Sequence, residues 1–272
     1  MKFPFLIAIA ALCLSSGSLR AQAPAYLGFD RNTYPGDANL KALRQTFSYT
    51  SYWLNNPPAE RTNTWAGHRA AVESDGFGFL VLFNGRVFAE LKSVANAKKV
   101  GASDAQAAAA AARREGFPAK TIIFLDQEQG GRMLPVQKAY IYAWVDAITA
   151  AGFRAGIYCS GVAAKDDGNI VTAEDIRQSA AGRHIVYWAI NDACPPAPGC
   201  VSSKNPPPVS AGGIPYAGIW QFAQSPRRKE RTARCAKTYA ADGNCYAPGD
   251  TSHQWFLDVN SATTPDPSSP PK

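Results

Sequence analysis

The chain has 272 residues, of which 46% are hydrophobic and 18% charged, and its formal net charge is +7. This composition excludes a disordered acidic tail, a collagen-like fibre and a coiled coil, and the length suits one α/β barrel of about 250 residues. Outside the N-terminal stretch no apolar run approaches the ~20 residues of a membrane span, so we expect no transmembrane segment.

The first 23 residues resemble a secretory signal peptide. Lys2 precedes an apolar stretch from Phe3 to Leu14, and Ala21 to Ala23 have the small-x-small form of a cleavage site. We therefore expect a secreted or periplasmic protein with a mature domain over residues 24–260. Removal of Lys2 and Arg20 lowers the net charge from +7 to +5. The remaining basic residues do not alternate with stacking aromatics, so we expect no nucleic-acid partner, although an anionic polymer would be attracted.

Short β-branched or aromatic runs alternate with longer helical stretches along the chain. The runs predict eight strands, at 26–30, 49–54, 77–83, 121–126, 154–159, 184–190, 217–223 and 255–259. The intervening stretches predict helices over 37–46, 65–74, 103–115, 134–151 and 172–181, with Ser103 and Thr172 as opening residues. This order favours parallel pairing, and eight such strands close into a (β/α)8 TIM-type barrel of the α/β class.

The pattern becomes irregular in the last third of the chain. Residues 191–216 are rich in Pro and Gly, and residues 225–254 form a long polar insertion. These segments follow the sixth and seventh predicted strands, so in a barrel both are loops at the carboxyl-terminal face, where active sites form. Residues 261–272 have the composition of a disordered Pro/Ser-rich tail.

Five cysteines remain after the predicted leader is removed. For an oxidising compartment we expect two local disulfides, Cys194 to Cys200 and Cys235 to Cys245, one stapling each long loop, with Cys159 as a buried free thiol. Zinc binding is the competing interpretation. The wide cysteine spacings and the absence of paired histidines argue against it, so we expect no metal.

Four carboxylates fall at or near strand ends: Asp30, Asp126, Glu128 and Asp258. Each alone could cap a helix, but together they predict one site at the barrel mouth. Asp126 and Glu128 project to the same face, and the nearby charges of Asp126 and Asp30 should raise the pKa of Glu128. An acid and a base at neutral pH are what glycoside hydrolysis requires, without any cofactor.

Aromatic side chains near the same strand ends could stack on sugar rings. These aromatic residues also include Tyr187 and Phe222. Because side chains alternate along a strand, at least half of the aromatic residues near the strand ends must point outward. The candidates for substrate contact are Tyr52, Trp53, Tyr158, Trp188, Trp220 and Gln221.

Several segments carry a resemblance to a known family: GFD at 28–30, FLDQE at 124–128, GIYCS at 156–160, WQF at 220–222 and FLDVN at 256–260. Over residues 25–260 the chain resembles the family 25 glycoside hydrolases, the lysozyme-type muramidases, and more closely a bacterial glycoside-hydrolase-like domain of unknown function related to them. The GFD-x3-YPG opening and the YWLNNPP segment fit that second branch better. The resemblance implies a barrel in which Glu128 is the acid, with Asp126, Asp30 and Asp258 around the bound sugar.

These observations predict a secreted, monomeric glycosidase that hydrolyses an N-acetylated glycan, above all peptidoglycan. Glu128 would protonate the glycosidic oxygen, and Asp126 would stabilise the oxocarbenium-like state or orient the substrate's acetamido group. Two alternatives remain at this point. The barrel could bind glycan without cleaving it, or the chain could be a cysteine hydrolase with Cys159 as nucleophile and His184 or His253 as base.

Overall fold

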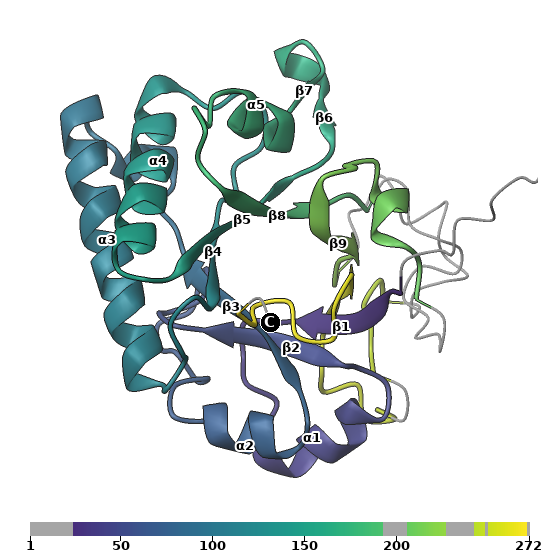
Figure 1. The fold of residues 1–272 in the computed structure, drawn as a ribbon. Helices are drawn as coiled ribbons and strands as arrows, with labels where there is room; N and C mark the ends of the chain where they lie inside the picture. Colours follow the sequence, from purple (N-terminus) through teal and green to yellow (C-terminus); the bar gives the residue numbers. More distant parts are fainter. Residues whose placement is uncertain (1–23, 193–205, 227–241, 248–249, 271–272) are drawn as a thin grey trace, which may run out of the picture.

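The computed structural model describes residues 24–192, 206–226, 242–247 and 250–270. Within them the chain forms a mixed α/β fold around a closed barrel, compatible with the predicted TIM type (Figure 1). Around the barrel the strand order is β1-β10-β9-β8-β5-β4-β3-β2. The bounds are β1 Tyr26–Asp30, β2 Tyr49–Trp53, β3 Gly78–Asn84, β4 Ile122–Asp126, β5 Arg154–Ser160, β8 Ile185–Ile190, β9 Ala217–Ala223 and β10 Asp258–Ala262, with a separate pair, β6 Ala163–Ala164 and β7 Ile170–Val171.

Among the described residues, helices lie along the outside of the barrel except beside β9, where a 3-10 turn packs instead (Figure 1). They are α1 Asp37–Arg44, α2 Arg69–Ser74, α3 Val94–Arg114, α4 Pro135–Ala150 and α5 Thr172–Gln178, with 3-10 turns at Phe88–Glu90, Lys165–Asp167 and Val209–Gly212. The predicted start of the third helix at Ser103 is wrong, because Ser93 caps α3 by accepting a hydrogen bond from the Asn96 N–H. Gly101 suits this longer helix, since a Cβ there would lie 2.3 Å from the Tyr140 carbonyl oxygen of α4.

The last strand departs from the prediction in position and in direction. The sequence predicts a parallel strand at 255–259, but β10 spans Asp258–Ala262 and runs antiparallel to both β1 and β9. The chain leaves β9 at the mouth of the barrel and enters β10 from the same end, without the crossover that a parallel connection requires. Asp258, the first residue of β10, therefore lies at the same end of the barrel as Asp30, the last residue of β1.

Large rings fill the barrel interior because two strands carry glycine there. A Cβ on Gly28 would lie 2.1 Å from the Tyr49 ring, and a Cβ on Gly156 would lie 2.4 Å from the Phe124 ring. Both rings are fully buried. Closely packed aromatic residues thus fill the barrel interior below its mouth.

The C-terminal segment packs against the barrel, so the predicted disordered tail is wrong over residues 261–270. Ser268 is buried at the end opposite the mouth: its N–H donates to the Phe79 carbonyl, and its own carbonyl accepts from the Ile122 N–H, both at 2.9 Å. Its hydroxyl accepts from the Val81 N–H (2.8 Å), and Asp266 accepts from the Phe79 N–H (2.8 Å). A segment with little apolar area is held because it pairs backbone groups at the start of β3 and β4.

Cys159 is a buried free thiol, as predicted. Cys245 is disulfide-bonded, but Cys194, Cys200 and Cys235 lie outside the described residues, so neither loop staple is established and both pairings remain predictions. The proposed leader over 1–23 also lies outside them. No helix in the described ranges combines the length and the apolar character needed to cross a membrane.

Candidate active site at the barrel mouth

The four predicted acids come together at the mouth of the barrel. Asp30 ends β1, Asp126 ends β4, Glu128 follows β4, and Asp258 begins β10. All four line one cavity of about 130 Å³, together with Asn32, Trp53, Pro58, Leu82, Tyr158, Trp188, Gln221 and Gln224. Their convergence follows from the shared rim of the parallel strands and from the reversed direction of β10. Their chemical roles remain predictions.

Asp30 accepts hydrogen bonds from two side-chain amides. Gln221 Nε2 lies 2.9 Å from one of its oxygens, and Asn260 Nδ2 lies 2.6 Å from the same oxygen. The two amides are oriented in turn, because the Tyr158 hydroxyl donates to Gln221 Oε1 and the Trp188 indole N–H donates to Asn260 Oδ1, both at 2.9 Å. Burial raises the pKa of Asp30 to about 7 despite these two amide donors, which lower it.

Asp126 and Glu128 form a coupled pair at different depths. Asp126 is 4% exposed, whereas Glu128 is open at the mouth. Neither carboxyl oxygen of Asp126 makes a hydrogen bond with another described group. Burial, followed by the negative charge of Glu128, raises the pKa of Asp126 well above its usual value. The pair therefore retains a proton at a higher pH than free carboxyls do.

The predicted rise in the pKa of Glu128 is confirmed in direction but not in cause. Partial removal from water by the cavity walls raises its pKa, and the neighbouring Asp126 carboxyl opposes that rise. Burial, followed by the negative charge of Asp30, raises the pKa of Asp258 well above the usual range, although the Ser225 N–H donates to this carboxyl. Burial is thus the main cause of the raised pKa of all four acids.

Three of the five predicted aromatic contacts line the cavity: Trp53, Tyr158 and Trp188. The Trp53 indole N–H donates to the Arg31 carbonyl (3.0 Å), and the rings of Tyr158 and Trp188 pack with centroids 4.5 Å apart. Gln221 also lines the cavity, as predicted. The rings are held by hydrogen bonds and by packing, which gives the mouth fixed apolar walls.

Tyr52 and Trp220 do not line the cavity, so both predicted contacts are wrong. Trp53 faces the cavity, and strand alternation then turns Tyr52 outward, where its hydroxyl donates to Glu115 at the end of α3. Gln221 faces inward in the same way, which turns Trp220 outward to donate to the Asn191 carbonyl (2.9 Å).

The sequence does not point to several residues of the site. Asn32, Pro58, Leu82 and Gln224 belong to the cavity wall, and no motif marks them. Asn260 could have been found, because it lies two residues after Asp258 and therefore on the same face of β10. Its role as the link between Asp30 and Trp188 depends on the antiparallel strand, which the sequence did not reveal.

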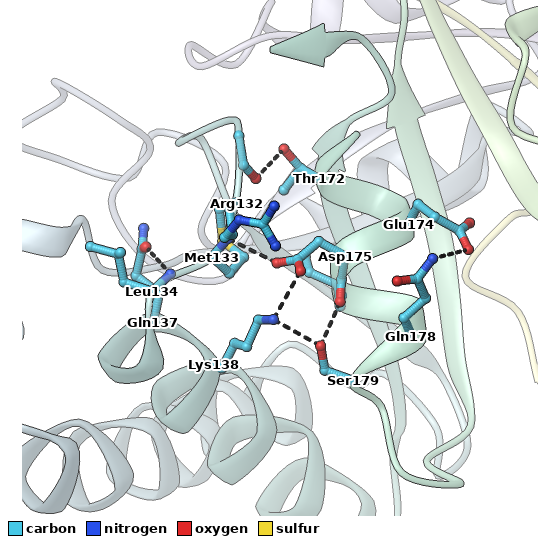
Figure 2. A network of polar contacts seen from close by, with 12 residues as sticks. Arg132, Met133, Leu134, Gln137, Lys138, Thr172, Glu174, Asp175, Gln178 and Ser179 are labelled. Carbon is cyan, nitrogen blue, oxygen red and sulfur yellow. Dashed lines mark hydrogen bonds and ion pairs between the residues drawn. The ribbon is translucent and has the colours of Figure 1, made fainter. Parts of the chain in front are cut away.

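Figure 2 shows how α5 holds the loop 129–134, which follows the carboxyl pair. The Met133 N–H donates to Asp175 Oδ2 (2.9 Å), and the Thr172 hydroxyl donates to a loop carbonyl (3.0 Å). Lys138 of α4 donates to the other oxygen of Asp175 (2.9 Å). Asp175 thereby joins the loop, α4 and α5.

The other site types weighed from the sequence find little support. In the described ranges, no three His, Cys, Asp or Glu side chains are grouped to hold a metal ion. Burial raises the pKa of the Cys159 thiol to about 12, so it is protonated at neutral pH and is a poor nucleophile. His253 stacks on Tyr246 in the segment before β10, with ring centroids 4.0 Å apart.

Comparisons with known proteins agree with this architecture. The model of the Rv2525c-like, glycoside hydrolase-like domain matches residues 47–195, which include Asp126 and Glu128. No curated protein matches the chain. An uncharacterized B. stearothermophilus protein of known structure is 18% identical (TM-score 0.55; 87% of this chain and 95% of that chain covered). The Tat-secreted protein Rv2525c of Mycobacterium tuberculosis, in complex with L-tartrate, is 11% identical (TM-score 0.52; 89% and 97%). The spore cortex lytic enzyme SleM of Clostridium perfringens is 14% identical (TM-score 0.54; 88% and 68%). At these identities the likeness to the solved structures shows a shared fold.

Proposed function

The chain belongs to the family of Rv2525c-like, glycoside hydrolase-like domains, and on that premise we propose that it is an exported glycosidase that hydrolyses an N-acetylated glycan, above all peptidoglycan. One observation carries the proposal. The deep carboxyl Asp126, which lacks any described donor, lies beside the open carboxyl Glu128 in a cavity that also contains Asp30 and Asp258. A structural role would not require a buried acid without hydrogen-bond donors.

The pair can supply both charges that glycoside cleavage requires. When Glu128 holds the shared proton, it donates that proton to the leaving glycosidic oxygen at the mouth. Asp126 is then ionised below, where its negative charge stabilises the oxocarbenium-like state or orients an acetamido group of the substrate. The leaving sugar departs with the proton from Glu128. Water then adds its hydroxyl to the anomeric carbon and gives its proton to the carboxylate pair, which restores the shared proton.

The walls of the cavity and the charge of the chain support a cell-wall substrate. Trp53, Tyr158 and Trp188 offer apolar faces to a sugar ring beside the acids. The formal net charge, +5 once the predicted leader is removed, favours an anionic polymer. One protein with this fold, SleM, is a spore cortex lytic enzyme. Export rests on the predicted leader, and N-terminal sequencing of the mature protein tests it.

Product analysis tests the proposal. Mature protein is incubated with purified peptidoglycan and, separately, with chitin oligomers, and new reducing ends are identified by mass spectrometry. We expect soluble peptidoglycan fragments that end in a reducing N-acetylated sugar. Binding of the same glycans without any new reducing end would replace the hydrolase by a glycan-binding barrel. If the protein neither binds nor cleaves these glycans, the proposal is overturned.

A further inference from the structure

Two phenylalanine rings are exposed on opposite sides of the mouth. Among the described residues the large exposed hydrophobic side chains are Val87, Phe88, Val94, Leu134 and Phe256, and the two rings are 44% (Phe88) and 50% (Phe256) exposed. Phe88 lies between β3 and α3, and Phe256 lies just before β10. In the closed strand order β3 is opposite β9, and β4 is opposite β10 (Figure 1). The acidic cavity therefore lies between the two rings.

The backbone under Phe88 is tied to the loop that follows the carboxyl pair. The Phe88 N–H donates to Gln129 Oε1 (2.7 Å), and Gln137 of α4 donates to the same oxygen (2.9 Å). Gln129 directly follows Glu128 in the chain. The backbone that carries the exposed ring is therefore held to the residue that follows Glu128.

Phe256 belongs to an aromatic group on the other side. Its ring centroid lies 5.7 Å from that of Tyr246, which stacks on His253 at 4.0 Å with an interplanar angle of 8°. The Tyr246 hydroxyl donates to Asp242 (2.7 Å). Ring stacking and this hydrogen bond hold the group in place while the Phe256 side chain remains half exposed.

The cavity between the rings is too small to hold a polymer. Its volume of about 130 Å³ is well below the roughly 300–1,000 Å³ of sites that enclose a whole ligand. It has room for part of one sugar unit, so a longer chain must make its other contacts on the rim. Apolar rings exposed at fixed places on a rim are surfaces on which the C–H faces of sugars can stack.

We propose that Phe88 and Phe256 are the two ends of a cleft that holds a glycan strand across the mouth, from the β3–β4 side to the β9–β10 side. The proposal rests on the proposed function, since it takes the glycan as the ligand. It makes the site selective for strand length, because a longer strand has more sugar units to place on the two rim rings than a disaccharide has.

Binding of uncrosslinked peptidoglycan strands tests this arrangement. The full chain carries Glu128→Gln to prevent cleavage, and the dissociation constant is measured by calorimetry for disaccharide and octasaccharide strands. Phe88→Ala and Phe256→Ala are compared with Phe88→Tyr, which keeps a ring, and with Tyr26→Ala, which removes a half-buried ring at the far end of β1. Circular dichroism confirms that each variant is folded.

We expect the octasaccharide to bind more tightly than the disaccharide, and each Phe→Ala change to weaken only octasaccharide binding, roughly three- to tenfold. Phe88→Tyr and Tyr26→Ala should have little effect. If the octasaccharide binds but both Phe→Ala variants match their parent, the cleft is wrong and the proposed function stands. If neither strand binds to the parent protein or to its Glu128→Gln variant, both proposals fail.

Discussion

Asp30 and Asp258 lie directly opposite each other, as the last residue of β1 and the first residue of β10 in their antiparallel register. Two acids from the two ends of the domain are thereby placed side by side at the barrel mouth. The negative charge of Asp30 contributes to the raised pKa of Asp258, so the ionised pair opposes folding. Repelling acids with raised pKa values of this kind are typical of functional sites.

The stability of the fold should depend on pH through its buried acids. An acid whose pKa is raised in the folded state binds a proton that the unfolded chain releases, so stability falls as pH rises from about 4, the ordinary value, toward about 7, the pKa of Asp30. Asp258→Asn keeps an acceptor for the Ser225 N–H and removes a charge. At pH 8 we expect its Tm to rise by about 2–4 °C, the equivalent of about 1 kcal/mol in a chain of this size.

At pH 4 the same change should have little effect on the Tm, because Asp258 is then protonated. Thermal unfolding followed by circular dichroism at both pH values measures the difference. If Asp258→Asn is less stable than the parent at pH 8, or gains equally at both pH values, repulsion between Asp30 and Asp258 does not destabilise the fold.

Asn260 is a positioning residue for Asp30. Asn260→Ala removes one donor to Asp30 and leaves the Trp188 indole N–H without its acceptor inside the barrel. Unsatisfied buried polar groups of this kind destabilise by about 1–3 kcal/mol. The pKa of Asp30 should rise further, since the Asn260 bond lowers it. Urea unfolding checks the loss, with exposed Asn56→Ala as control, and equal midpoints for the two variants would refute the role.

The buried hydroxyl of Ser268 accepts the Val81 N–H at the closed end of the barrel. We expect Ser268→Ala to lower the free energy of unfolding by about 1–2 kcal/mol, because the β3 N–H loses its partner. Ser269→Ala is the matched control, since its side chain is less buried. Equal stability of both variants would mean that the C-terminal segment does not support the barrel.

Asp175 accepts bonds from both the Met133 N–H and Lys138. Asp175→Ala should release the loop 129–134, so that amide exchange at Met133 quickens at least about tenfold and turnover falls by about tenfold as Glu128 loses its position. Glu174→Ala changes the neighbouring acid of α5, which bonds to Gln178 and Tyr216 instead. Unchanged exchange at Met133 in Asp175→Ala would contradict this anchoring.

The positions of the strands, and of the acids at their ends, could be predicted because local sequence patterns mark them. Runs of β-branched and aromatic residues predicted seven strands of the barrel closely, and acids at strand ends predicted the mouth. The side that each aromatic residue faces was not predictable, because one residue of register decides it. Trp53 and Gln221 therefore line the cavity, and Tyr52 and Trp220 do not.

The remaining errors come from partners that are distant in the chain. The composition around Ser268 predicted disorder, yet its partners Phe79 and Val81 lie on β3. The antiparallel direction of β10 depends on the path of the segment after β9, for which no local pattern exists. Tertiary contacts decided both features, and composition could not reveal them.

The most direct test of the account is the rate at which Glu128→Gln releases reducing ends from purified peptidoglycan, measured beside the parent protein with glycan binding determined on the same preparations. The substitution keeps the shape of the side chain and removes the proton that the raised pKa retains. We predict that the parent cleaves peptidoglycan and that the variant is at least about 100-fold slower, the usual contribution of a general acid, with binding nearly unchanged. A variant that cleaves at the parent's rate would show that Glu128 is not the acid.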